Sequence, residues 1–238
     1  MRAMILAAGR GERMRPLTDH VPKPLLHVGG RSLLAWHLSA LARAGFREVV
    51  INHAYLGAQI PAALGDGSAW GLRITYSDEG EVPLETAGGI FNALPLLGPE
   101  PFLLVNGDIW TDYDFGRLPT LDPDALAALV LVPNPPQHPH GDFALSPNTH
   151  GTLNILADPQ RLAAADGPPR YTYSGIGIYR PEIFEGCEPG RFPLLPILQR
   201  AAAASRLRGS IYWGSWSDVG TPQRLRELDE RLAAAAIG

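Results

Sequence analysis

The first 110 residues alternate short apolar runs with stretches of helical spacing. One helical stretch places Leu34, Leu38 and Leu41 on one face after Ser32, a residue type favoured at helix N-caps. Helices are also predicted over Tyr55–Leu64, interrupted early by Pro61, and over Gly88–Leu94. The runs that predict buried strands are Ala3–Ala8, Glu48–Asn52, Leu72–Ser77 and Phe102–Val105. This order predicts an α/β fold with a mostly parallel sheet flanked by helices. Such sheets bind ligands beyond the carboxyl ends of their strands, so the loops after Ala8 and Val105 are the expected places for chemistry.

The second half is less regular, and Pro133–Pro147, with five prolines, predicts a long loop. Strands are predicted at Ala125–Val132, Thr152–Leu156, Tyr171–Tyr179 and Ser210–Trp213, the middle two antiparallel, and helices at Leu194–Ala204 and Thr221–Ala235. Because no linker separates the halves, we expect one domain over residues 1–238. Its parallel half covers about residues 1–110, and an added ligand-binding half covers about residues 111–238.

Composition excludes several classes of protein. A formal net charge of -4 and a pI of about 6.0 argue against a nucleic-acid-coating protein. Cys187 is the only cysteine, which excludes an intrachain disulfide framework and a multi-cysteine metal site. With neither a targeting signal nor an apolar run near the ~20 residues of a membrane span, we expect a cytoplasmic protein without a membrane partner.

The first predicted strand runs into a loop that holds Gly9 and Gly11, followed by Arg13 and Lys23, the only lysine of the chain. Glycines let backbone N–H groups approach phosphate oxygens, and the basic residues add positive charge, so this loop fits a polyphosphate. The spacing of a P-loop is absent. A dinucleotide-binding motif would need a third glycine where Met14 stands. A glycine-rich surface turn with solvated arginines is the alternative.

The string LAAGRGERMRPLT followed by PKP, within residues 6–24, resembles the signature of the sugar-1-phosphate nucleotidyltransferases. The resemblance implies a GT-A-like (Rossmann-like) fold, in which the parallel half binds the nucleotide and the added half binds the sugar. It also implies that Arg13 and Lys23 contact the phosphates and act as catalytic residues. The nucleotide-binding residues that it implies are Ala7, Ala8, Gly9, Gly11, Glu12, Arg13, Lys23, Glu85 and Gly88.

Two acidic residues are candidate magnesium ligands. Asp108 follows a predicted buried strand, where a carboxylate is well placed for Mg²⁺, although Asn106-Gly107-Asp108 also fits a plain turn. Thr221 is a better-placed N-cap than Asp218, which leaves Asp218 for another role. The resemblance implies that both aspartates bind metal. They lie far apart in the sequence, so only the fold can bring them together.

The resemblance places nucleobase recognition near Glu85–Gly89, where a helix start is the alternative interpretation. For the sugar it implies contacts from Asn106, Asp142, Asn154 and Ser174. Members that act on glucose 1-phosphate usually carry an acid–lysine pair in the strand where this chain has Leu153-Asn154-Ile155. That phosphate contact is therefore either missing here or supplied by an arginine, which argues against a glucose substrate. The two histidines His138 and His140 in the proline-rich loop are expected to be solvated.

The implied reaction is transfer of UMP from UTP to N-acetylmuramate α-1-phosphate with release of pyrophosphate, in the recycling of peptidoglycan. Guanylyl transfer to mannose 1-phosphate and thymidylyl or uridylyl transfer to glucose 1-phosphate are the alternatives inside the family. Outside it stand a catalytically silent nucleotide-sugar-binding regulator and a dinucleotide-dependent oxidoreductase. The expected partners are UTP, a sugar 1-phosphate and Mg²⁺, without nucleic acid.

Overall fold

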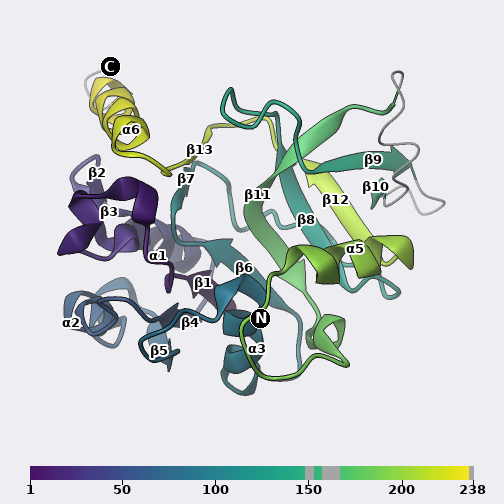
Figure 1. Cartoon of the computed structure of the whole chain (residues 1–238), viewed down its shortest axis with the longest axis horizontal. Coiled ribbons are helices and arrows are strands. Elements are labelled where there is room, and N and C mark those ends of the chain that lie inside the picture. The colour runs from purple at the N-terminus through teal and green to yellow at the C-terminus, as the bar shows by residue number, and fades with distance from the viewer. Residues whose placement is uncertain (148–152, 157–166, 236–238) are drawn as a thin grey trace.

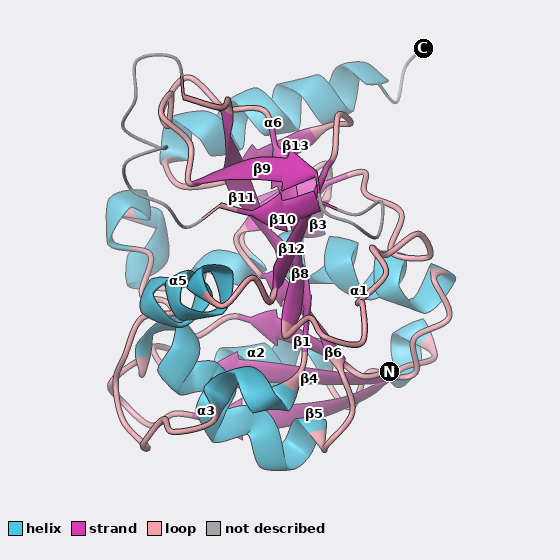
Figure 2. Cartoon of the chain, turned by 90° about the vertical axis from the view of Figure 1, so that its right-hand side faces the viewer, coloured by secondary structure: helices cyan, strands magenta, loops and turns pink. Residues whose placement is uncertain are grey.

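Among the described residues of this computed structural model (1–147, 153–156 and 167–235), nine strands form one twisted sheet (Figures 1 and 2). Their spatial order is β5-β4-β1-β6-β11-β8-β12-β10-β9. The strands are β1 (Ala3–Leu6), β4 (Glu48–His53), β5 (Arg73–Asp78), β6 (Phe102–Asn106), β8 (Ala127–Val132), β9 (Phe143–Pro147), β10 (Leu153–Ile155), β11 (Arg170–Tyr179) and β12 (Leu207–Ile211).

The parallel half of the sheet follows the sequence prediction. Strands β5, β4, β1 and β6 are parallel neighbours, and their carboxyl ends open onto the same edge. Along β1, Ala3 and Ile5 face one apolar core and Met4 faces the other, because successive side chains of a strand point to opposite faces. Helices α1 (Leu33–Arg43) and α2 (Gln59–Leu64) cover the first face, and α3 (Glu85–Leu97) and α5 (Leu195–Ala203) cover the second.

The other half contains most of the antiparallel pairings. Strand β11 lies between β6 and β8 and is antiparallel to both, whereas β8 and β12 are parallel. The predicted mixed sheet flanked by helices is therefore confirmed, with its parallel pairings gathered mainly on the side of β1. Strands β10 and β11 are antiparallel to their neighbours, as predicted, but each pairs with β9 rather than with the other.

Three sequence predictions need correction. Phe143–Pro147 lies in the predicted proline-rich loop but forms β9, because the other prolines precede it and Pro147 is its last residue. The helix predicted over Tyr55–Leu64 begins only at Gln59, because Leu56 has a φ of 52°. The helix predicted over Gly88–Leu94 is longer and runs over Glu85–Leu97, since both ends bury apolar side chains.

The boundaries of two strands also differ from the predictions. Strand β12 begins at Leu207, before the predicted Ser210–Trp213, and ends at Ile211. Strand β10 covers Leu153–Ile155, and the first residue of its predicted range, Thr152, lies outside the described residues. The helices α1, α5 and α6 (Pro222–Ala235) match their predictions to within about two residues at each end.

Two small ladders complete the fold. Strand β7 (Ile109–Thr111) pairs antiparallel with β13 (Trp216–Asp218), and β2 (His27–Val28) pairs with β3 (Arg31–Ser32). Helix α6 packs on the β2–β3 hairpin, where the Asp229 carboxylate accepts a 2.7 Å hydrogen bond from the backbone N–H of Gly29 (Figure 1). In the described part of the chain, every helix is too short or too polar to cross a membrane.

Candidate active site

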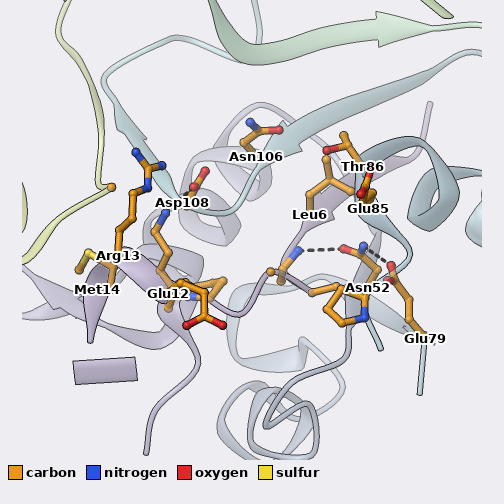
Figure 3. Close-up of a pocket in the computed structure, with 18 residues that line it drawn as sticks. Leu6, Glu12, Arg13, Met14, Asn52, Glu79, Glu85, Thr86, Asn106 and Asp108 are labelled. Atoms are coloured by element: carbon orange, nitrogen blue, oxygen red, sulfur yellow. Dashed lines mark hydrogen bonds and ion pairs between the residues drawn. The ribbon is translucent and has the colours of Figure 1, made fainter. Parts of the chain in front are cut away.

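A cavity of about 370 Å³ lies at the carboxyl ends of β1, β4 and β6 (Figure 3). Arg13 and Asp108 stand at one end of it, and Glu79, Glu85 and Thr86 stand at the other. The implied nucleotide-binding residues that line this cavity are Ala7, Ala8, Gly9, Gly11, Glu12, Arg13, Lys23 and Glu85. The cavity thus has a basic end beside the glycine-rich loop and a less basic end at the start of α3.

The glycine-rich loop is folded around Gly11, which has a φ of 69°. The Gly11 carbonyl accepts hydrogen bonds from the Thr18 hydroxyl (2.9 Å) and from the Met14 backbone N–H (2.8 Å). A Cβ at Gly11 would lie 3.0 Å from the Cβ of Lys23, so both the left-handed backbone and the close approach require glycine. This packing places the buried Lys23 directly against the loop.

Lys23 and Asp108 form an ion pair inside the cavity. Lys23 begins a short 3-10 turn, Lys23–Leu25, and its Nζ lies 2.5 Å from Oδ2 of Asp108. The lysine side chain is 9% exposed and the aspartate side chain 40%, and both residues line the cavity. The ion pair places the Lys23 ammonium beside the glycine-rich loop, near the place where phosphates would sit.

The fold brings Asp108 and Asp218 together. In the β7–β13 ladder Asp218 pairs with Ile109, and the backbone N–H of Val219 donates a 2.9 Å hydrogen bond to the carbonyl of Asp108. Both aspartates line a second cavity of about 230 Å³ that adjoins the first. The sequence could not predict that the two aspartates lie close together, because their closeness depends on a pairing between segments 109–111 and 216–218.

The structure confirms Thr221 as the N-cap of α6 and shows which contacts Asp218 makes instead. Thr221 does cap α6, since its hydroxyl accepts a 3.3 Å hydrogen bond from the backbone N–H of Arg224. However, the Asp218 carboxylate is ion-paired with the Arg224 guanidinium and accepts a 2.6 Å hydrogen bond from the side-chain amide of Gln137. Each of the two aspartates thus has a basic partner.

The implied sugar-binding residues divide into two groups. Asn106 and Ser174 line the second cavity, although the Ser174 hydroxyl donates to the Val130 carbonyl at 2.7 Å. Asp142 and Asn154 are outside the cavity lining. The Asp142 carboxylate accepts a 2.7 Å hydrogen bond from the Tyr173 backbone N–H, and Asn154 pairs with Arg208 and Ser146 within the sheet.

Gly88, implied as a nucleotide-binding residue, is buried and is not part of the cavity lining. Its N–H donates a 3.1 Å hydrogen bond to the Phe192 carbonyl, and a Cβ there would lie 2.3 Å from the Gly190 carbonyl oxygen. The structure therefore gives Gly88 a close packing contact between α3 and the segment before α5.

Sequence reasoning missed several residues of the two cavities. Asn52 and Glu79 line the first, and Gln137, His138 and Trp216 line the second. Asn52 carried a usable signal, because it is the polar last residue of a predicted parallel strand. His138 was expected to be solvated, but it lines the second cavity, with Nε2 2.9 Å from Oδ1 of Asp142.

A neutral histidine supports the strand that follows Asp108. His37 of α1 is buried, and its Nε2 lies 2.9 Å from the carbonyl oxygen of Ile109. Burial lowers the pKa of His37 to about 4, against the smaller opposing effects of that hydrogen bond and of Asp108. At neutral pH this imidazole is uncharged and donates to β7.

The parallel strands opening onto a glycine-rich loop, the buried lysine and the paired carboxylates define an enzyme site built for a polyphosphate ligand. The family model described as "Nucleotidyl transferase" matches residues 2–235, and the chain belongs to this family of nucleotidyltransferases.

Two curated relatives and one solved structure are similar to the chain over nearly its whole length. The chain is 53% identical to the N-acetylmuramate α-1-phosphate uridylyltransferase of Neisseria meningitidis serogroup B, with 99% of each chain covered. It is 36% identical to the enzyme of the same name from Caulobacter vibrioides, with 98% of this chain and 97% of the relative covered. A crystal structure of a putative glucose-1-phosphate thymidylyltransferase from Bacillus anthracis has the same fold, with a TM-score of 0.78 at 19% identity, covering 98% of this chain and 95% of that one.

Proposed function

We propose that this protein transfers UMP from UTP to N-acetylmuramate α-1-phosphate, giving UDP-N-acetylmuramate and pyrophosphate, in the cytoplasmic recycling of peptidoglycan. The observation that carries the proposal is the meeting of Asp108 and Asp218 at the boundary of two cavities, with Lys23 on Asp108. The first cavity has the basic end that a nucleoside triphosphate needs, and we assign the second cavity to the acceptor. The two relatives that carry this activity in their names cover nearly the whole chain.

The reaction requires no general base. The acceptor phosphate has a second pKa of about 6, so at neutral pH one of its oxygens is already a nucleophile. That oxygen forms a new bond to the α-phosphorus of UTP, while the bond from the α-phosphorus to the bridging oxygen of pyrophosphate breaks. The difficulty is to bring two anions together, and catalysis comes from positioning and charge neutralisation.

The chain supplies those two contributions from different elements. Backbone N–H groups of the loop at Gly9 and Gly11 hold the phosphates of UTP, and Arg13 binds the leaving pyrophosphate. Lys23 neutralises charge beside the reacting centre, where its burial keeps water away from the ammonium. Asn106, which lines both cavities, is placed to hydrogen-bond the acceptor. We propose one catalytic domain, in which residues up to about 110 bind the nucleotide and the rest bind the sugar.

The residues present fit Mg²⁺. Asp108, in the turn before β7, and Asp218, at the end of β13, both offer carboxylate oxygens, and their side chains are 40% and 29% exposed. Each carboxylate is ion-paired with a basic side chain, and carboxylate oxygens are the ligands that a hard cation such as Mg²⁺ prefers. Bound to these two residues, Mg²⁺ would neutralise phosphate charge and align the two phosphates.

The substrate assignment is tested by pyrophosphate release with UTP, GTP and dTTP against the 1-phosphates of N-acetylmuramate, glucose and mannose. We expect the highest kcat/KM for UTP with N-acetylmuramate α-1-phosphate. Faster turnover of GTP with mannose 1-phosphate would replace this assignment. Tight nucleotide-sugar binding without pyrophosphate release from any pair would indicate a regulatory relative instead.

The metal assignment is tested by Asp108→Asn and Asp218→Asn, which keep the shape of each side chain and remove its charge. We expect kcat to fall at least about 100-fold in each, the scale on which removing one electrostatic contact slows an enzyme. Asp114→Asn is the matched control, since Asp114 is exposed and outside both cavity linings. Near-normal rates in both variants, with unchanged circular dichroism, would contradict the assignment.

A further inference from the structure

A chain of hydrogen bonds crosses the carboxyl edge of the sheet beneath the first cavity. The side-chain oxygen of Asn52, at the end of β4, accepts from the backbone N–H of Ala7 at 2.8 Å. Its side-chain nitrogen donates to Oε1 of Glu79 at 2.6 Å, and Oε2 of Glu79 accepts from the backbone N–H of Leu84 at 2.7 Å (Figure 3). The chain of bonds therefore joins the loop after β1 to the residue that precedes α3.

The direction of each bond is fixed by its partners. Ala7 offers only an N–H, so the oxygen of Asn52 must face it and the NH₂ group must face Glu79. Glu79 then receives two donors, one on each oxygen, which a carboxylate can accept and a single amide oxygen in the same geometry cannot. Asn52 is 2% exposed, so an unmade bond at this residue would leave a buried polar group unsatisfied.

We call the hydrogen bonds that run from Ala7 through Asn52 and Glu79 to Leu84 the Asn52–Glu79 bridge. Helix α3 leaves space for this bridge. A Cβ at Gly89 would lie 2.3 Å from Oε1 of Glu79 and 2.8 Å from Nδ2 of Asn52. Glycine in a helix interior costs about 1 kcal/mol relative to alanine. The glycine at this position lets the carboxylate and the amide lie against the helix, which connects the bridge to the element that carries Glu85 and Thr86.

We infer that Glu79, held by Asn52, is a positioning residue that sets the nucleobase end of the cavity relative to the phosphate loop. Residues Pro83, Glu85 and Thr86 line that end, and Ala7 and Gly9 line the phosphate end. The distance between the two ends has to match the length of one nucleotide, and the Asn52–Glu79 bridge spans them. This inference rests on the proposed function in one respect, the presence of a nucleoside triphosphate in this cavity.

A reversal of polarity tests the bridge. Asn52→Asp keeps the acceptor for Ala7 but faces Glu79 with a second carboxylate, and Glu79→Gln leaves one of two N–H donors without an acceptor. In the double variant Asn52→Asp with Glu79→Gln, the aspartate accepts from Ala7 and from the glutamine NH₂, and the glutamine oxygen accepts from Leu84. The double variant therefore restores all three bonds, with donor and acceptor exchanged only in the central bond between residues 52 and 79.

Steady-state kinetics with UTP give the readout, with thermal unfolding of each variant measured in parallel. We expect each single variant to raise the KM for UTP about tenfold or more, with a smaller change in kcat, as loss of a charge-assisted buried hydrogen bond implies. The double variant should return to within about threefold of the wild type, because neighbouring sites couple. Glu81→Gln, in the same loop but exposed and outside the lining, should behave as the wild type.

Gly89→Ala provides an independent test, because its methyl group displaces the Glu79 carboxylate without touching either polar side chain's chemistry. We expect the KM for UTP to rise as in Glu79→Gln. Single variants that keep the KM within twofold of the wild type would overturn the inference. A double variant whose KM for UTP is as high as that of the worse single variant would also overturn the inference. It would show instead that Glu79 contacts the nucleotide directly.

The experiments distinguish an error in the positioning role of Glu79 from an error in the proposed function. If the wild type uses GTP in place of UTP, the proposed function is wrong, and the same KM series measured with GTP decides the bridge. If the wild type turns over no nucleotide, calorimetric titration with UTP replaces KM by Kd for the same variants. Equal Kd values across the series would then overturn the bridge by itself.

Discussion

Lys23 is singled out both by the composition of the chain and by its place in the structure. In a chain of 19 arginines it is the only lysine, and the structure places it beside Asp108 and against Gly11. An ammonium is narrow and sits on a flexible stem, whereas a planar guanidinium is wider and binds as a fork. We therefore expect the position to require lysine for reasons of shape as well as charge.

We predict that Lys23→Arg lowers kcat/KM at least about tenfold while the protein stays folded, because the guanidinium cannot reach the phosphates from the same buried position. The measurement is pyrophosphate release beside far-ultraviolet circular dichroism. Arg117→Lys, at an exposed ion pair with Asp114, is the reciprocal control and should be silent. A Lys23→Arg variant with more than half of the wild-type rate would show that the lysine is incidental.

At this scale, the predicted residues that line the first cavity are mainly those with a local signal. The loop residues Gly9 and Gly11 lie within a few residues of one another, so a short motif contains the whole feature. Asp142 and Asn154, implied as sugar contacts, are outside both cavity linings, and their roles stay predictions. The link between Asn52 and Glu79 was missed because it joins two strands, and a pattern read along one strand does not contain it.

Among the elements, the support of β7 by α1 has a consequence for pH. Burial holds the pKa of His37 at about 4 in the folded protein, below the ordinary value of 6.5. The unfolded chain therefore binds more protons between these values, so this contribution to stability is complete above pH 6.5 and is lost as the pH falls towards 4. At pH 5 the loss amounts to about 2 kcal/mol.

We predict that His37→Gln removes part of the acid sensitivity, because glutamine can donate to the Ile109 carbonyl without titrating. The comparison is the slope of the unfolding free energy between pH 6.5 and pH 5 in urea titrations, not its absolute value. The slope should be smaller in the variant by about 1–2 kcal/mol over this interval. Equal slopes would mean that other groups cause the acid sensitivity.

Element prediction worked where burial on both faces gives an unbroken apolar run, as in β1, β6 and β8. It failed at β9, whose residues follow a proline-rich segment and whose partners Arg170 and Tyr171 lie far along the chain. The start of α2 was wrong because the positive φ of Leu56 has no sequence signature in a residue other than glycine or asparagine.

On the scale of the whole molecule, the sheet is continuous across both halves. Strand β11 of the second half pairs directly with β6 of the first, over Ile176–Tyr179. Both strands are buried, with side chains in the two apolar cores that flank the sheet. We therefore expect the two halves to lose structure together.

Hydrogen exchange tests whether the two halves unfold together. We predict that the slowest amides of β1 and β8 exchange with the same free energy of opening, within about 1 kcal/mol, because both require global unfolding. Urea unfolding followed by circular dichroism should show one transition of matching free energy. A difference of several kcal/mol between the two strands would divide the chain into two cooperative units.

Two of the described residues that line the cavities are shared by both, Asn106 and Asp108, and they stand together at the end of β6. All the other lining residues belong to one cavity only. Under the proposed assignment of the two cavities, substitutions that change the choice of base would accumulate without altering the choice of sugar, and the reverse would also hold. An ancestor with this layout could then exchange one preference at a time, while the two shared residues at the end of β6 stayed unchanged. Under the same assignment, the second cavity could be redesigned for new acceptors without changes to the residues that line only the first.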